Sequence, residues 1–195
     1  MGQLNRFLQR HPFDFLPARY WQRFFWSLLG LTIVLMIVFG ISGAPLTTTA
    51  APYGVVSFEL AGSVEKTDLI LSSWDADVQL RAAFGLGLDY LFMAVYASTV
   101  ALGCGIAAQV LRRTGWPLGS WGSLLGWAVI LAAILDSIEN FALTTLIFGS
   151  VDSPWPEIAR WCAILKFTLI FIGIVYVTYG GVVAMVVRIS PTEEE

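Results

Sequence analysis

The stretch that decides the fold is DYLFMAVYASTVALGCGIAAQVLRR, residues 89–113. Between Asp89 and Arg112 it carries no charged side chain. As a helix, this apolar run is long enough to cross the ~30 Å hydrocarbon core of a bilayer. It therefore predicts a membrane-spanning helix, with Asp89 at one end and a pair of arginines at the other.

Three further segments have the same character, and the composition agrees with them. Hydrophobic residues make up 57% of the 195-residue chain and charged residues only 13%, whereas soluble domains carry about 25% charged residues. These features predict an all-α, four-helix transmembrane bundle, formed by one domain over residues 24–188. The expected helices are 24–43, 84–111, 118–148 and 157–187.

Arginines predict the orientation of this bundle. They gather before the first helix, between the second and third, and after the fourth: Arg6, Arg10, Arg19, Arg23, Arg112, Arg113 and Arg188. If the four helices alternate in direction, all of these lie on one side, which the positive-inside rule assigns to the cytoplasm. We expect an integral protein of the bacterial inner membrane with both termini cytoplasmic, comprising a basic cytoplasmic or interfacial leader (1–23) and an acidic tail (189–195).

The outer connection, residues 44–83, is too long and too apolar for a simple loop. From Val55 onward its apolar residues recur at helical spacing, and Ser63 stands where a helix N-cap would. We expect one or two short helices capping the outer end of the bundle.

Polar residues interrupt three of the helices at a common height. Counted from the cytoplasmic ends, the first charges are Asp89, Asp136 and Lys166. Glu139 and Asn140 share a helix face with Asp136, because they follow it by three and four residues. A charge facing hydrocarbon costs at least ~3 kcal/mol, so we expect these side chains to point into the bundle.

Together with polar residues of the outer loop, this layer is the candidate ligand-binding site. Lys166 can neutralise one acid, and the others need a proton, water or a cationic partner. A purely structural salt-bridge network between bundle and loop is the alternative interpretation. The candidate residues are Glu59, Trp74, Asp75, Asp89, Tyr96, Asp136, Glu139, Asn140 and Lys166.

Small residues predict where helices approach closely. Gly122 and Gly126 share the face of Asp136, and Gly173 and Gly180 share that of Lys166. Such stripes could serve contacts within the chain or with a partner. The Gly85-Leu-Gly87 sequence is expected to ease helix packing.

Several chemistries find no support in the sequence. His11 is the only histidine, which argues against haem and histidine-rich zinc sites, and we expect it at the surface. An oxygen-ligand cation site of Asp89, Asp136, Glu139 and Asn140 is chemically feasible, but we expect no metal and no cofactor. No phosphate-binding loop or activated nucleophile is present. Catalytic residues therefore stay unassigned, although Asp136 or Glu139 could act as a general acid or base.

Three strings resemble a group of bacterial four-helix integral membrane proteins of uncharacterised activity. They are FELAGSVEKTDLILSSWD (58–75), LGLDYLFMAVY (86–96) and LDSIENFAL (135–143). The resemblance implies a membrane topology and carries over no activity.

Three functions follow as hypotheses. The first is binding, with transformation left open, of a lipid-like or amphipathic small molecule with a cationic or hydroxyl group near the outer leaflet. The second is an accessory or assembly subunit of a larger membrane complex, and the third a small cation- or proton-coupled transporter. The expected partners are membrane lipids and, for the latter two, a larger complex or a second copy; no nucleic acid is expected.

Overall fold

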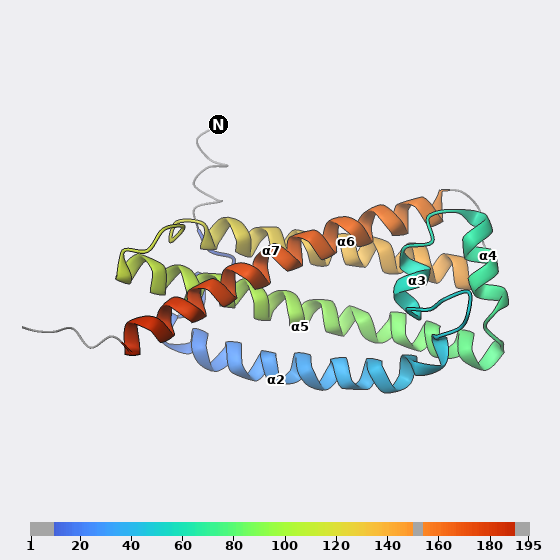
Figure 1. The fold of residues 1–195 in the computed structure, drawn as a ribbon, viewed down its shortest axis with the longest axis horizontal. Helices are drawn as coiled ribbons and strands as arrows, with labels where there is room; N and C mark the ends of the chain where they lie inside the picture. Colours follow the sequence, from blue (N-terminus) through green and yellow to red (C-terminus); the bar gives the residue numbers. More distant parts are fainter. Residues whose placement is uncertain (1–9, 150–153, 190–195) are drawn as a thin grey trace, which may run out of the picture.

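Four long helices run side by side along the length of the molecule (Figure 1). The structure, a computed structural model, describes residues 10–149 and 154–189. Within these residues all regular elements are helical, which confirms the predicted fold class. The long helices are α2 (Ala18–Gly43), α5 (Ala76–Thr114), α6 (Gly122–Ile147) and α7 (Trp155–Ile189). All four are long and apolar enough to cross a membrane, so the chain is a polytopic membrane protein.

The start of α2, the loop between α5 and α6 and the end of α7 lie at one end of the bundle (Figure 1). This is the arrangement that four alternating helices require. The predicted leader and tail are only partly covered, because residues 1–9 and 190–195 lie outside the described residues.

Two helices begin more than one turn earlier than predicted. α2 starts at Ala18 rather than residue 24, and α5 at Ala76 rather than residue 84. The early start of α5 has a local cause, since the carboxylate of Asp75 accepts a hydrogen bond from the Val78 amide at 2.9 Å. An aspartate in this position satisfies an otherwise free N–H of the first turn.

The outer end carries a small helical cap, as predicted. It consists of η1 (Ala44–Leu46), α3 (Val55–Glu59) and α4 (Val64–Ser72), and Ser63 caps α4 by accepting from the Lys66 amide at 3.3 Å. The buried indole of Trp74 donates to the Leu46 carbonyl at 2.9 Å. An apolar cluster joins cap and bundle through Phe58, Ile70, Trp74, Leu86 and Leu143, among others.

The long helices are covered very unequally. α5 is the central helix and is mostly buried by its neighbours, whereas few residues of α2 are buried. α2 packs mainly on α5, and it lies at the edge of the bundle in Figure 1. The flank of α5 that lies between α2 and α7 is therefore left uncovered.

Glycines bring α5, α6 and α7 together. A Cβ on Gly180 would lie 2.4 Å from the Ala107 Cβ and 2.7 Å from its Cα, and one on Gly122 would lie 2.7 Å from the Cys104 carbonyl oxygen. These glycines thus serve contacts within the chain. The expectation for Gly85 and Gly87 is wrong, because neither has a packing neighbour within 4 Å of its Cβ position.

The expectation for His11 is also wrong, since its side chain is buried against α5 and α6. Its Nε2 lies 2.9 Å from the Ala101 carbonyl oxygen, and its Nδ1 accepts from the Phe13 amide at 3.2 Å. The ring fits there because Gly105 and Gly126 leave room for it, with both Cβ positions 2.9 Å from Nε2. The neighbouring glycines were visible in the sequence, but their partner was not.

Adjacent glycines on α7 test the close packing of α5 and α7. Gly180→Ala should destabilise the protein by about 1–3 kcal/mol, because the new methyl group meets backbone atoms that cannot move aside. Gly181→Ala should be neutral or stabilising, since no atom lies within 4 Å of its Cβ position and alanine favours helix by about 1 kcal/mol. Thermal unfolding in detergent measures both. Equal effects would contradict the packing described.

The segment around His11 packs against α5 and α6, and this docking should depend on pH. Burial lowers the pKa of His11 below its usual 6.5, an effect that Arg112 reinforces and that the Ala101 carbonyl and Asp14 oppose. The undocked ring gains a proton below about pH 6.5 and the docked ring does not, so docking is complete above this pH and weakens as the pH falls.

A spin label at the exposed Phe15 position reports this docking. In a Phe15→Cys protein with Cys104→Ala and Cys162→Ala, the label should become mobile as the pH falls below about 6.5. The same label in a His11→Asn background should show no step near this pH. A step that persists without His11 would assign it to another group.

Candidate functional site

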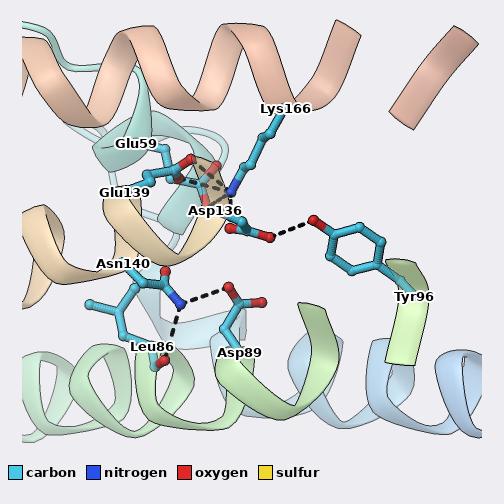
Figure 2. A network of polar contacts seen from close by, with 8 residues as sticks. All are labelled: Glu59, Leu86, Asp89, Tyr96, Asp136, Glu139, Asn140 and Lys166. Carbon is cyan, nitrogen blue, oxygen red and sulfur yellow. Dashed lines mark hydrogen bonds and ion pairs between the residues drawn. The ribbon is translucent and has the colours of Figure 1, made fainter. Parts of the chain in front are cut away.

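The polar layer converges on the ammonium group of Lys166 (Figure 2). Lys166 on α7 donates to Oδ1 of Asp136 at 2.7 Å and to Oε1 of Glu139 at 2.9 Å. Glu59, on α3 of the cap, approaches the same nitrogen at 3.9 Å, too far for a hydrogen bond. One cation thus links α6, α7 and the cap, and the predicted convergence of these side chains is confirmed.

A second set of contacts joins this centre to α5. The Tyr96 hydroxyl donates to Oδ2 of Asp136 at 2.8 Å. The Asn140 amide donates to Oδ2 of Asp89 at 2.8 Å and to the Leu86 carbonyl at 3.2 Å. Figure 2 shows Asp136 between Lys166 and Tyr96, so its two oxygens serve partners on different helices. We call Glu59, Asp89, Tyr96, Asp136, Glu139, Asn140 and Lys166 the polar cluster.

The cluster is shielded from the surroundings of the protein. Asp136, Glu139, Asn140 and Lys166 are all at least 95% buried, and Glu59 is 91% buried. Only Asp89 is half-buried. Apolar side chains of the cap cluster lie on one side of this layer, and on the other lie Met93, Ala97 and Val129. The polar groups must therefore satisfy one another or an occupant.

They do not fully satisfy one another. Oε2 of Glu59 is buried without a hydrogen-bond donor, whereas Oε2 of Glu139 lies 2.9 Å from the Lys166 ammonium. Burial raises the pKa of Glu59 to about 7; Asp89 and Asp136 add to this effect, while Lys166 opposes it. Three carboxyl groups lie within 4 Å of the one ammonium, and Asp89 adds a fourth beside Asn140. The cluster therefore holds more acid than its own base can neutralise.

A groove opens beside the cluster, on the flank of α5 between α2 and α7. Its volume is about 670 Å³. The polar end includes Glu59, Asp89, Tyr96, Asp136 and Lys166. The rest is mainly apolar and lined by residues such as Leu29, Ile33, Met36, Phe39, Phe92, Phe167, Ile170, Ile174 and Val177.

The groove is open toward the lipid side. Ile33 and Met36 on α2 line it and are about half exposed, as are Phe167 and Ile174 on α7. In a bilayer these side chains meet acyl chains, so a lipid-soluble molecule can reach the groove from within the membrane. Sequence reasoning missed the contribution of α2. Thr32 was the available signal: it is a hydroxyl in an apolar run, and its oxygen lies 3.2 Å from that of Thr99 on α5.

Two candidate residues lie outside the cluster. Asp75 is exposed and serves as the N-cap of α5. Trp74 is buried in the cap, contacts Phe58 edge to face and does not line the groove. Both share the predicted outer loop with Glu59, but the start of α5 at Ala76 directs them away from the cluster.

No metal-binding geometry accompanies the acids. Among residues 10–149 and 154–189, no group of three or more histidine, cysteine or acidic side chains is placed to hold an ion. Within the cluster, Lys166 takes the position between Asp136 and Glu139 that a cation would need.

Comparison of this chain with protein-family models, with curated proteins and with solved structures gives no match.

Replacing Lys166 tests how much the structure depends on the cluster. Lys166→Met should destabilise the protein by about 3–5 kcal/mol, because it leaves Asp136 and Glu139 buried without their counter-ion. Lys66→Met, on the exposed face of α4, should change stability by less than about 0.5 kcal/mol. Unfolding in mixed micelles measures both. If the two variants were equally stable, the ammonium would not be holding the acids together.

Proposed function

We propose that this membrane protein binds a lipid-like or amphipathic small molecule in the groove between α2 and α7. The apolar part of the molecule lies along α5, and its cationic or hydroxyl group lies at the polar cluster. The observation that carries the proposal is the continuity of the groove, which leads from lipid-facing apolar walls to buried acids, among them Glu59 with an unpaired carboxylate oxygen.

The size of the groove suits such a ligand. Small-molecule pockets typically enclose 300–1,000 Å³ and combine apolar walls with a few polar groups; this groove encloses about 670 Å³. Along α7 it extends from Lys166 to Thr178, which is ~18 Å at 1.5 Å per residue. That is a little more than half of a ~30 Å hydrocarbon core, so the apolar part matches the depth of one leaflet.

We propose that the polar cluster lies toward the outer leaflet. The arginine distribution supports cytoplasmic termini, and the cap lies at the opposite end of the bundle (Figure 1). The cluster includes Glu59 of this cap. We propose the bacterial inner membrane as the location, with the ligand approaching from the outer half of the bilayer.

The two other hypotheses have less support. A coupled transporter needs a polar path across the membrane, but the inner half of the groove is mainly apolar. An accessory subunit could dock through glycine stripes, but Gly122, Gly173 and Gly180 pack against neighbours in the same chain. The proposal does not require that the ligand is chemically transformed. Tyr96 and Asp136 form the proton donor–acceptor pair that lines the groove.

Two glycines two residues apart on α5, and therefore on nearly opposite faces of this helix, provide a matched test. Gly85 lines the groove and has no atom within 4 Å of its Cβ position, whereas Gly87 is equally free but does not line the groove. Gly85→Trp should therefore fill the polar end of the groove without disturbing the helices. Gly87→Trp places the same side chain outside the groove and serves as the control.

Mass spectrometry of the purified protein provides the measurement. We expect an amphipathic molecule to co-purify with the parent protein and with Gly87→Trp, and to be reduced at least about tenfold in Gly85→Trp, equivalent to ~1.4 kcal/mol of binding. Identical extracts from all three proteins would contradict binding in the groove.

A further inference from the structure

The charge of the polar cluster is unbalanced toward acid. Lys166 is surrounded by the carboxyl groups of Glu59, Asp136 and Glu139. A fourth carboxyl group, that of Asp89 on α5, accepts a hydrogen bond from Asn140. A lysine ammonium has three N–H donors and no acceptor. Lys166 directs two of them to Asp136 and Glu139, and the Glu59 carboxyl group lies 3.9 Å from the same nitrogen. Lys166 therefore has little left to offer to an anionic ligand.

Glu59 is the clearest unpaired acceptor that faces the groove. The residue is 91% buried, its Oε2 has no hydrogen-bond donor, and it lines the groove. Leaving a buried acceptor unpaired costs about 1–3 kcal/mol, and more for a charged group. Asp89 lines the same end of the groove and is half-buried. Two carboxyl groups, one from α3 and one from α5, thus line the polar end of the groove.

We propose that the polar end of the groove selects the protonated amine of a long-chain amphiphile and binds it against the carboxylates of Glu59 and Asp89. This inference rests on the proposed function, because it names the class of molecule that the groove takes. The ammonium supplies both the hydrogen-bond donors and the positive charge that the cluster lacks.

Other head groups fit these residues less well. A hydroxyl group brings one donor and no charge, so it cannot offset the excess acid. A phosphate or carboxylate would be repelled by the acids and finds no free base beside them. The other base among the described lining residues is Arg81, which is exposed and lies eight residues outward from Asp89 along α5, or ~12 Å by helix rise. An anion held there would sit away from the cluster.

Binding of an amine should compete with a proton on Glu59. In the empty groove burial raises the pKa of Glu59 to about 7, against the opposing charge of Lys166 and with added repulsion from Asp89 and Asp136. Glu139 lies across Lys166 from it. Below pH 7 the amine must displace this proton, so its affinity should rise with pH up to about 7 and then level off. The ligand itself stays charged throughout, because alkyl amines resemble lysine with a pKa near ~10.4.

The test compares three radiolabelled probes that share one tail: tetradecylamine, tetradecanol and tetradecyl phosphate. Their binding is measured to the full-length protein in phosphatidylcholine nanodiscs, with empty nanodiscs as the correction for partitioning. We expect the amine to bind at least about tenfold more tightly than the alcohol near pH 8, a difference of ~1.4 kcal/mol. Near pH 5.5 its affinity should fall by about tenfold or more, whereas that of the alcohol should not change.

Matched variants locate the effect. Glu59→Gln should weaken amine binding about tenfold and should weaken alcohol binding much less. Glu65→Gln, an exposed position on α4, should leave all three probes unaffected. If Glu59→Gln does not fold, Asp89→Asn provides the same comparison at the half-buried acid.

The possible outcomes distinguish failure of the amine selectivity from failure of ligand binding in the groove. Equal binding of amine and alcohol, or tightest binding of the phosphate, would overturn the amine selectivity while leaving a groove that binds amphiphiles. Amine binding that is unaffected by Glu59→Gln and by Asp89→Asn would overturn the assignment to these carboxylates. If none of the probes binds above empty nanodiscs, the groove itself is not a binding site and both proposals fall.

Discussion

The ion cluster around Lys166 is the interaction on which the rest of the structure depends. Its ammonium draws Asp136 and Glu139 of α6 toward α7, and Asp136 in turn holds Tyr96 of α5. Within the membrane no water is present to solvate these groups, so separating the helices would leave their charges unpaired. The cluster therefore fixes the relative positions of three helices and, through Glu59, of the cap.

The same cluster explains why the groove has a polar end. α5, α6 and α7 pack closely, helped by Gly122, Gly173 and Gly180, but α2 packs mainly on α5. The flank of α5 between α2 and α7 is consequently left uncovered, and the side of the cluster that contains Asp89 and Glu59 opens onto it. A structural network and a ligand site are thus not exclusive here: Lys166 completes the network, while the surplus acid faces the groove.

Much of the site could be predicted from residue positions, because the bilayer makes a charge in an apolar run costly and so forces it inward. Asp89, Asp136 and Lys166 interrupt their runs at one height, and the helical spacing of Asp136, Glu139 and Asn140 places them on one face. The prediction was weaker in the loop. Glu59 joins the cluster, whereas Asp75 caps α5 and Trp74 packs in the outer cap, since their directions depend on where α5 begins.

The sequence by itself determined four spanning helices, their alternating direction and a common polar level, because hydrophobic length and helical periodicity are local properties of the chain. Only the tertiary structure decided that His11 fills the space left by Gly105 and Gly126, that α2 stands apart from α7, and that a groove results. These features arise from the angles and distances at which distant segments pack. The periodicity of a single helix does not determine which neighbouring helix covers its flank, or whether that flank stays uncovered.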